Sequence, residues 1–576
     1  MLNRPTFGGH ITIGWAFLFF YFCLEFYNFC CLCNIKVISD FLLTTQMKFK
    51  KIFPIIAVVL LTFSCNTNNS NIDDITDDEG VYGYATYTDG RPIAGMVVSD
   101  GFSAVITDKD GFYSIESPSP HTFYIFASIP ADCKIVENSE GNPDFYHKYT
   151  ADRSRYDFKF ERMAVENDFV VYALADPQCK DNVHITRFES ETIADILKTQ
   201  KSESLPIYGV TLGDIVYSEG KRNCAPYMAE MRRVMSSRNI GFPVFQTMGN
   251  HDVFASATEP IVAQDFNLGY QRDFESIFGP VNFSWNRGTV HFVHMRNVIF
   301  RSNTVYDSYE DGFTMAQVEW LRQDLKYVPK DKLVVLCVHI PLLKNSDGNI
   351  HLVRFALSDF DNAIVFSGHT HYMRNEPDLP LPEKVHAAVS GAWWHSVLNG
   401  DGSPNGYGIH YFSGNKIVNS IYKGVNGKMA SKEYQIRMYR GNAKTGGKYE
   451  KFQFPLTSGD VVASIFNSSS AWNVKVFEDG VYSGDMQRIP AKRYTGDVIG
   501  ADSSQDWWAI GYNVGVVGRG HVSGTRSNYM TSSYGTWKYT LKNPEADVRI
   551  EATDGYGNKY VCTHFTPDFD YSDLGE

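Results

Sequence analysis

Short apolar segments that alternate with helical segments constrain the fold of residues 168–400 more than any other feature. Residues 169–175 are apolar throughout, as a strand buried on both faces requires. Residues 184–199 carry apolar side chains at helical spacing, and Thr314 with Gln317 forms a capping box for a further helix. The other expected elements are strands at 206–212, 242–248, 332–339 and 363–367 and a helix near 226–236. This order predicts an α/β layered domain with buried, largely parallel strands.

Five of these predicted strands end in side chains of the kind that bind metals. In α/β folds, chemistry gathers just beyond the carboxyl ends of the strands. The strand ends carry, in chain order, Asp176 with Gln178, Asp214, Asn250 with His251 and Asp252, His339, and His369 with His371. Buried polar groups of this number need partners, and together they match the mixed oxygen and nitrogen shell of a first-row divalent metal. Glycines at 213, 249 and 368 would let the backbone approach the ions closely.

The regions on either side of this domain are predicted to be all-β. In residues 81–162, Asp-Gly pairs at 89–90, 100–101 and 110–111 are strong hairpin signals, which indicates a small β-sandwich. These turns could also suggest a calcium site, although ordinary hairpin chemistry accounts for them. Residues 408–576 return to short strands and Gly, Asn and Asp turns, which predicts a second all-β domain.

The N-terminal residues have the layout of an export signal. Residues 47–64 combine a basic start with an apolar stretch, and a cysteine, Cys65, follows them. This pattern resembles a bacterial lipoprotein signal, in which the cysteine is lipidated. The polar, acidic residues 66–80 then suit a flexible tether, and residues 1–46 would be an upstream misreading of the gene. The alternative is a membrane segment at 11–24, which is shorter than the roughly 20 residues needed to span a bilayer.

Charge and cysteine content narrow the class of protein further. The chain has 53 Lys and Arg against 65 Asp and Glu, a net charge of −12. Because an acidic chain lacks the basic footprint of a duplex-binding protein, nucleic acid is not expected as the main partner. Only five cysteines, far apart and without C-x-x-C spacing, follow Cys65. Neither a disulfide framework nor a structural zinc site is therefore expected.

The motifs D-x-[H/Q], G-D, G-N-H-D, a lone His and G-H-T-H, in this order, resemble the calcineurin-like metallophosphoesterase superfamily. The resemblance implies a multidomain protein with a central four-layer αββα sandwich at 168–405, flanked by all-β domains. The segment 92–113 is similar to the transthyretin-like, carboxypeptidase-regulatory module. Both flanking regions are similar to those found around bacterial secreted members of the superfamily.

The resemblance also implies two divalent metal ions and assigns their ligands. The first ion would be held by Asp176, Gln178 and His371, the second by Asn250, His339 and His369, and Asp214 would bridge both. His251 would face the phosphoryl group and either stabilise the transition state or protonate the leaving oxygen. A hydroxide activated by the two metals would attack a phosphate mono- or diester in line, while the ions neutralise the phosphate oxygens.

Two positions depart from the family pattern. The family usually has histidine where this chain has Gln178, and a neutral, harder amide oxygen favours Mn²⁺, Fe or Mg²⁺ over Zn²⁺ at the first site. A subset of the superfamily has this D-P-Q form, so the change does not imply loss of activity. Tyr217 stands where the Ser/Thr protein phosphatases have an aspartate that orients the catalytic histidine. This second departure weakens assignment to the protein-phosphatase branch.

Several neighbouring residues have simpler structural explanations. We expect Cys337 to pack in the core and Asp252 to fix the G-N-H-D turn. Trp507 and Trp508 are expected in the core of the C-terminal β region. Arg374 could meet a phosphate oxygen or be a solvated surface residue. The segment 393–395 (Trp-Trp-His) could form a substrate wall or pack internally.

The sequence thus predicts an exported, lipid-anchored metallophosphoesterase of the bacterial cell envelope. It would hydrolyse a phosphorylated small molecule, phosphoprotein or phosphoglycan, with Mn or Fe as the favoured metals and the lipid anchor as its only membrane contact. The alternative is a non-catalytic surface lipoprotein that binds partners through its β domains and uses the central domain as a scaffold. A glycan-binding surface on the C-terminal sheet could coexist with catalysis.

Overall fold

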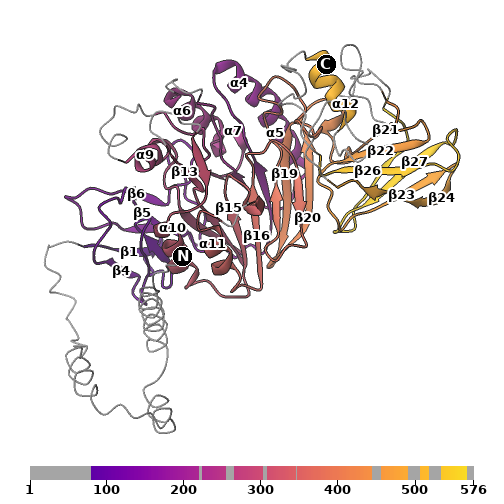
Figure 1. Ribbon diagram of the computed structural model, residues 1–576. Coiled ribbons are helices and arrows are strands. Elements are labelled where there is room, and N and C mark those ends of the chain that lie inside the picture. Colours follow the sequence, from indigo (N-terminus) through magenta and orange to yellow (C-terminus); the bar gives the residue numbers. More distant parts are fainter. Residues whose placement is uncertain are drawn as a thin grey trace, which may run out of the picture. The chain divides into compact units, whose positions relative to one another are not determined.

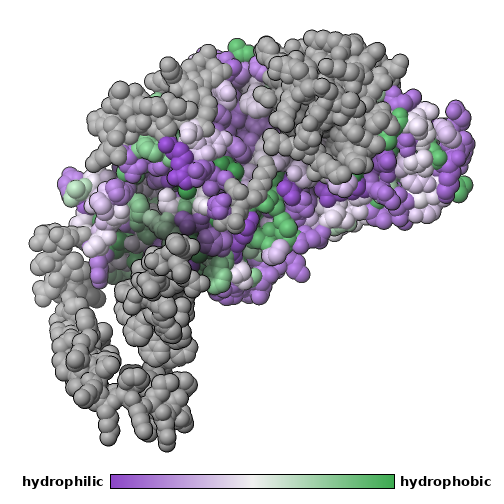
Figure 2. Space-filling view, viewed as in Figure 1, coloured by the Kyte–Doolittle hydropathy of each residue, from purple (hydrophilic) through white to green (hydrophobic). Residues whose placement is uncertain are grey.

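The computed structural model describes residues 80–218, 224–254, 265–301, 308–344, 347–443, 456–490, 506–517 and 533–566. All of these lie in one compact unit, Asp77–Glu576. The predicted signal at 47–64, Cys65, most of the tether and the segment 11–24 lie outside the described residues. Within the described residues, no helix has the length and apolar character needed to cross a bilayer. The described surface is mainly hydrophilic on the face shown in Figure 2, with separate apolar patches.

The N-terminal region forms two small sheets. One has the order β4-β1-β7 and the other β3-β2-β5-β6. Their strands are β1 (Val81–Tyr87), β2 (Val97–Ser99), β3 (Ala104–Ile106), β4 (Phe112–Ile115), β5 (Tyr124–Ala127), β6 (Tyr146–Lys148) and β7 (Phe158–Phe160). At the second Asp-Gly pair, the Asp100 carboxylate accepts hydrogen bonds from the backbone N–H groups of Phe102 and Ser103. Hairpin chemistry therefore accounts for this turn.

A five-stranded sheet of order β10-β9-β8-β19-β20 carries the first three predicted strands of the central domain. Its members are β8 (Asp168–Leu174), β9 (Ile207–Thr211), β10 (Val244–Phe245), β19 (Gly406–Ser413) and β20 (Lys416–Gly424). β8, β9 and β10 are parallel, whereas β19 pairs antiparallel with β8. The prediction that residues from 408 onward belong to the C-terminal β domain is therefore wrong for β19 and β20. These two strands belong to the central sheet instead, because β19 pairs with β8 and β20 pairs with β19.

A six-stranded sheet of order β11-β12-β15-β16-β18-β17 forms the second β layer. It consists of β11 (Phe283–Arg287), β12 (Val290–His294), β15 (Leu333–Cys337), β16 (Asn362–Ser367), β17 (Arg374–Glu376) and β18 (Glu383–Val385). The two sheets meet through aromatic side chains. Trp285 stacks on Phe245 with ring centroids 4.2 Å apart, and Phe169 contacts Phe292 at 6.2 Å.

Helices cover the outer faces of both sheets, which completes the predicted αββα sandwich (Figure 1). Alternate residues of β8 point to opposite layers: Val171 joins the core between the sheets, and Tyr172 the core under the helices. The helices beside the first sheet are α4 (Asn182–Arg187), α5 (Ala194–Thr199), α6 (Ala225–Val234), α7 (Ser237–Ile240) and α9 (Phe266–Phe278), and those beside the second are α10 (Met315–Leu325) and α11 (Ile350–Leu357). A π-helical turn, Phe188–Ile193, joins α4 to α5. The capping box of Thr314 and Gln317 at the start of α10 is confirmed.

The C-terminal region forms another pair of four-stranded sheets, β21-β22-β26-β25 and β24-β23-β27-β28. The strands are β21 (Ile436–Arg440), β22 (Asp460–Ile465), β23 (Asn473–Glu478), β24 (Val481–Asp485), β25 (Gln487–Arg488), β26 (Thr536–Thr540), β27 (Val548–Thr553) and β28 (Lys559–Cys562). Trp508 is buried as expected, but it lies on a short helix, α12 (Trp507–Ile510), and packs in a cluster with Leu398 and Tyr439.

The cysteines of the described residues lie in the interior. Cys133, Cys179, Cys224, Cys337 and Cys562 are all buried and form no disulfide bond. Cys337 has no exposed surface and belongs to the core between the sheets.

Candidate metal centre

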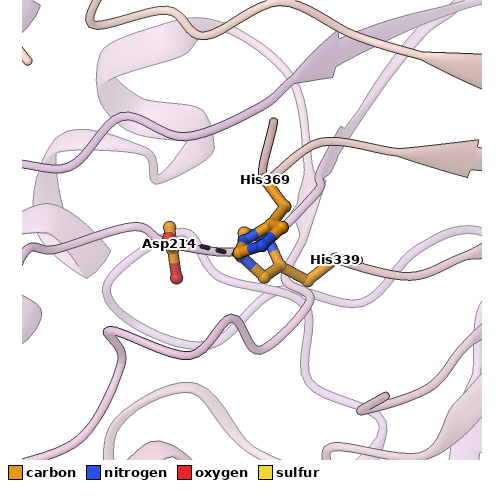
Figure 3. A group of neighbouring side chains, drawn as sticks. All are labelled: Asp214, His339 and His369. Carbon is orange, nitrogen blue, oxygen red and sulfur yellow. Dashed lines mark hydrogen bonds and ion pairs between the residues drawn. The ribbon is translucent and has the colours of Figure 1, made fainter. Parts of the chain in front are cut away.

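The seven predicted ligands form one continuous set of contacts at the carboxyl ends of the strands. Asp214 is its centre: one carboxylate oxygen, Oδ2, accepts a hydrogen bond from Gln178 Nε2 at 2.9 Å and lies 3.2 Å from His339 Nε2. Asp214 therefore contacts one side chain from each predicted ligand group. Figure 3 shows its carboxylate directed at the two imidazoles of His339 and His369.

The predicted ligands of the second ion lie together. His339 Nε2 is 2.9 Å from Asn250 Oδ1 and 3.1 Å from His369 Nδ1. Ligand atoms of Asp214, His339 and His369 all lie within 4.8 Å of one another. These three residues lie far apart in the chain. They meet because the strands that precede them, β9, β15 and β16, end at the same edge of the sandwich.

The predicted ligands of the first ion lie beside this group. His371 Nε2 is 3.5 Å from Asp176 Oδ1, and the other Asp176 oxygen accepts the backbone N–H of His369 at 2.8 Å. Gln178 completes the group through its contact with Asp214.

The donor set fits two divalent metal ions. Asp176 Oδ1 and Gln178 Oε1 are buried acceptors without a hydrogen-bond donor. Buried acceptors of this kind cost free energy unless something positive lies beside them. Two carboxylates, two amide oxygens and three imidazoles provide a shell that suits Mn, Fe, Mg or Zn, although no single metal is selected by it.

Hydrogen bonds to backbone carbonyls fix the imidazole orientation. His339 Nδ1 lies 2.8 Å from the Leu212 carbonyl oxygen, which leaves Nε2 to face Asp214 and Asn250. A metal-binding histidine usually donates the N–H of one ring nitrogen to such an acceptor and binds the metal through the other. Asn297, which no sequence motif marked, accepts the backbone N–H groups of His339 and Ile340 through its side-chain oxygen.

The backbone at the site is strained. Five of the seven side chains belong to residues with φ between 45° and 67°, namely Asp176, Gln178, Asp214, His369 and His371. A left-handed conformation costs a non-glycine residue roughly 1–2 kcal/mol. Such conformations persist where surrounding contacts enforce them, and they cluster at functional sites.

Glycines make room for the ligand side chains. A Cβ atom on Gly249 would lie 2.2 Å from Asp214 Oδ1, and one on Gly368 would lie 2.6 Å from Asp176 Oδ2. The sequence predicted that these glycines let the backbone approach an ion closely. In the structure, what approaches Gly249 and Gly368 closely is a ligand carboxylate from a neighbouring loop.

Electrostatics couple Asp214 and His339. Burial alone would raise the Asp214 pKa, but His339 and His251 hold that pKa well below its usual range. Burial alone would lower the pKa of His339, but the Asp214 carboxylate raises it to about 9. Because a metal ligand must be the neutral imidazole, binding of an ion at His339 would release any proton held on Nε2.

Asp252 stabilises the turn rather than contacting a ligand side chain. Its carboxylate accepts the backbone N–H groups of Gly249 and Val216, and the residue has no exposed surface. Burial and the nearby Asp214 carboxylate raise its pKa to about 7. The structure supports the turn-fixing role expected for this residue.

His251 lies at the edge of the ligand set. Its backbone N–H donates to Asp214 Oδ1 at 2.8 Å, while its ring packs against Tyr217 with centroids 4.4 Å apart. Tyr217 occupies the position at which the Ser/Thr protein phosphatases have an aspartate, and its ring contacts the ring of His251. Two further residues, both partly exposed, have rings that contact predicted metal ligands. The ring centroids of Trp393 and His371 are 4.6 Å apart, and those of Tyr309 and His369 are 6.0 Å apart. No sequence motif marked Tyr309.

The two open alternatives have different outcomes. Trp394 packs internally, whereas Trp393 is partly exposed and contacts the predicted ligand His371, so a substrate wall stays a prediction for Trp393. Arg374 pairs with Glu376 at 2.8 Å and lies over the Tyr534 ring, with no described contact to the seven ligands.

Three family models match consecutive parts of the chain. "Calcineurin-like phosphoesterase" matches residues 169–373, "N terminal of Calcineurin-like phosphoesterase" matches 79–163, and "C terminal of Calcineurin-like phosphoesterase" matches 383–560. No curated protein sequence matches the chain.

Solved structures with similar folds share little sequence with this chain. A dimetal phosphatase from Danio rerio is 14% identical, with 44% of this chain and 95% of that chain covered and a TM-score of 0.31. GAP50 of Plasmodium is 13% identical, with coverage of 45% and 85% and a TM-score of 0.32. A 5'-nucleotidase from Candida albicans is 12% identical, with coverage of 45% and 52% and a TM-score of 0.30.

Proposed function

Because this chain belongs to the calcineurin-like phosphoesterases, and is therefore a metal-dependent phosphoric ester hydrolase, we propose that its reaction takes place at the ligand set centred on Asp214. The observation that carries the proposal is that one carboxylate oxygen, Asp214 Oδ2, contacts both Gln178 Nε2 and His339 Nε2. A carboxylate that contacts both ligand groups is suited to bridge two cations. The first ion would be held by Asp176, Gln178 and His371, and the second by Asn250, His339 and His369.

The side chains divide the work as follows. Two divalent ions held here would activate water for attack and offset the charge on the phosphoryl oxygens. Asp214 sets the position of both ligand groups, and the Leu212 carbonyl holds the His339 ring in the tautomer that exposes Nε2. His251, which is partly exposed, would donate a proton to the leaving oxygen or stabilise the transition state.

We expect Mn²⁺ or Fe²⁺ to restore more activity than Zn²⁺ after the protein has been stripped with a chelator. The reason is that Gln178 offers a neutral amide oxygen where an imidazole would favour zinc. Hydrolysis of a panel of phosphate mono- and diesters, with Mn²⁺, Fe²⁺, Mg²⁺ and Zn²⁺ added separately, measures this preference. In Gln178→His the preference should move toward Zn²⁺ without loss of hydrolysis.

The same panel tests the proposal as a whole. A protein that uses this fold only as a scaffold would hydrolyse no ester with any metal. Total loss of bound metal in Gln178→His would place Gln178 outside the ligand shell.

The enzyme is proposed to act outside the cytoplasm, anchored to a bacterial envelope membrane through lipid on Cys65. The support is the sequence alone: a basic start, an apolar stretch and a cysteine in residues 47–65, followed by an acidic tether. Its substrate would then be an exported or extracellular phosphate ester, such as a phosphorylated small molecule, phosphoprotein or phosphoglycan.

Replacement of Cys65 by serine should move the protein from the detergent-soluble membrane fraction to the soluble periplasmic or extracellular fraction. The cause would be loss of the acyl chains, since the anchor is the only membrane contact proposed. Immunoblots of fractionated cells measure the distribution, and Cys133→Ser, at a buried cysteine, serves as the matched control. A variant that stays with the membrane would contradict lipid anchoring and favour the segment 11–24.

A further inference from the structure

The loop after residue 390 holds two consecutive tryptophans in an uncommon backbone conformation. Trp393 has φ 51° and Trp394 has φ 60°. L-residues with large side chains rarely adopt this left-handed region, and such residues occur where surrounding contacts enforce them. The contacts of the two indoles differ.

Packing explains Trp394. The residue is 4% exposed, and its indole Nε1 donates to the Pro177 carbonyl oxygen at 2.7 Å. Arg187 donates to the Trp394 carbonyl oxygen and lies over its ring. These contacts fix the loop against the segment that carries Asp176 and Gln178.

Trp393 lies beside a predicted metal ligand. The residue is partly exposed, and its ring centroid lies 4.6 Å from that of His371 at an interplanar angle of 31°. A partly exposed indole beside a predicted metal ligand offers a flat surface on which another ring can stack.

A second ring contacts the other histidine of the same loop. Tyr309 on β14 (Tyr309–Asp311) is partly exposed and lies edge-on to His369 at 6.0 Å. Both imidazoles of the G-H-T-H loop therefore have an aromatic neighbour that reaches the surface. This arrangement favours a substrate that is apolar and planar next to its phosphate.

We propose that Trp393 is a specificity-determining residue that stacks on an aromatic ring in the leaving group of the phosphate ester. The inference rests on the proposed function, since it requires ester hydrolysis at this centre. The chemistry it selects is a planar aromatic ring attached near the phosphate, as in a phenol or a nucleoside.

The test compares Trp393→Ala and Trp393→Phe with the wild-type protein. Phenyl phosphate, adenosine 5'-monophosphate and glycerol 3-phosphate, each also supplied as the methyl diester, provide ring-bearing and ring-free substrates. Tyr482→Ala removes an aromatic ring that is 51% exposed on the C-terminal sheet and serves as the control. The readouts are KM, kcat and bound metal per chain.

In Trp393→Ala we expect KM for a ring-bearing ester to rise about tenfold, because a stacking partner is lost. KM for the glycerol esters and the bound metal should stay within about twofold of the wild-type values, and Trp393→Phe should recover most of the loss. A rise for the phenyl esters alone would identify phenols as the preferred ring, and a rise for the adenosine esters alone would identify nucleosides.

Equal losses on ring-bearing and ring-free esters, or loss of metal, would overturn the inference and make Trp393 a support for His371. Those outcomes would leave the proposed function intact, since the wild-type protein would still hydrolyse its ester. A wild-type protein that hydrolyses none of the esters with any metal overturns the proposed function and this inference with it.

Discussion

Asp214→Asn should lower both the metal content and the rate of hydrolysis, the rate by about 10³-fold or more. The side chain is 1% exposed and contacts members of both ligand groups, so a neutral amide there would leave two cations without their shared carboxylate. Offsetting charge at a dinuclear centre is worth several kcal/mol, and about 4 kcal/mol corresponds to a factor of 10³. Bound metal measured by elemental analysis, together with initial rates, checks the prediction.

The matched control is Asp324→Asn. Asp324 is also 1% exposed and pairs with a histidine, His291, at 2.8 Å, but that pair lies between β12 and α10. Its loss should lower the thermal stability while the metal content remains. If Asp214→Asn kept its metal and its rate, the bridging role would have to be abandoned.

His251→Ala should retain both metal ions and lose activity by about 10²–10⁴-fold, the usual contribution of one general acid. Metal should remain because His251 contacts Asp214 through its backbone N–H, and alanine keeps that hydrogen bond. His339→Ala provides the contrast, since that imidazole faces Asp214, Asn250 and His369 and its removal should reduce the bound metal.

The leaving group shows how His251 acts. If it donates a proton, its removal should slow alkyl phosphates far more than p-nitrophenyl phosphate, whose phenolate leaves without a proton. Equal losses on both substrates would indicate electrostatic stabilisation of the transition state instead. Loss of metal from His251→Ala would make this residue a ligand and would require a new assignment of the site.

Much of the site could be predicted from the sequence because its information is local. Each ligand lies only a few residues after a buried strand, and parallel strands bring their carboxyl ends to one edge. Asp176, Asp214 and His339 therefore had to approach one another once β8, β9 and β15 formed the predicted sandwich. The capping box at Thr314 was predictable for the same reason, since both partners lie within one turn of helix.

The sheet to which a strand belongs was not predictable in the same way. Residues 406–424 have the short strands and turns of the β domain that follows, yet β19 pairs with β8. Alternating apolar residues specify a strand with a buried face, but they do not specify which neighbour supplies its hydrogen bonds. The hairpin of β11 and β12 was not among the predicted elements. In the structure it forms one edge of the second sheet.

By itself, then, the sequence determined the layered central domain, the β regions beside it and the residues that gather at the metal centre. Only the tertiary structure decided how those residues meet. It holds five ligand residues in left-handed backbone conformations, seats Asn297 under His339 and directs Trp393 onto His371. The physical reason is that local preference opposes such conformations, so contacts between distant segments must enforce them.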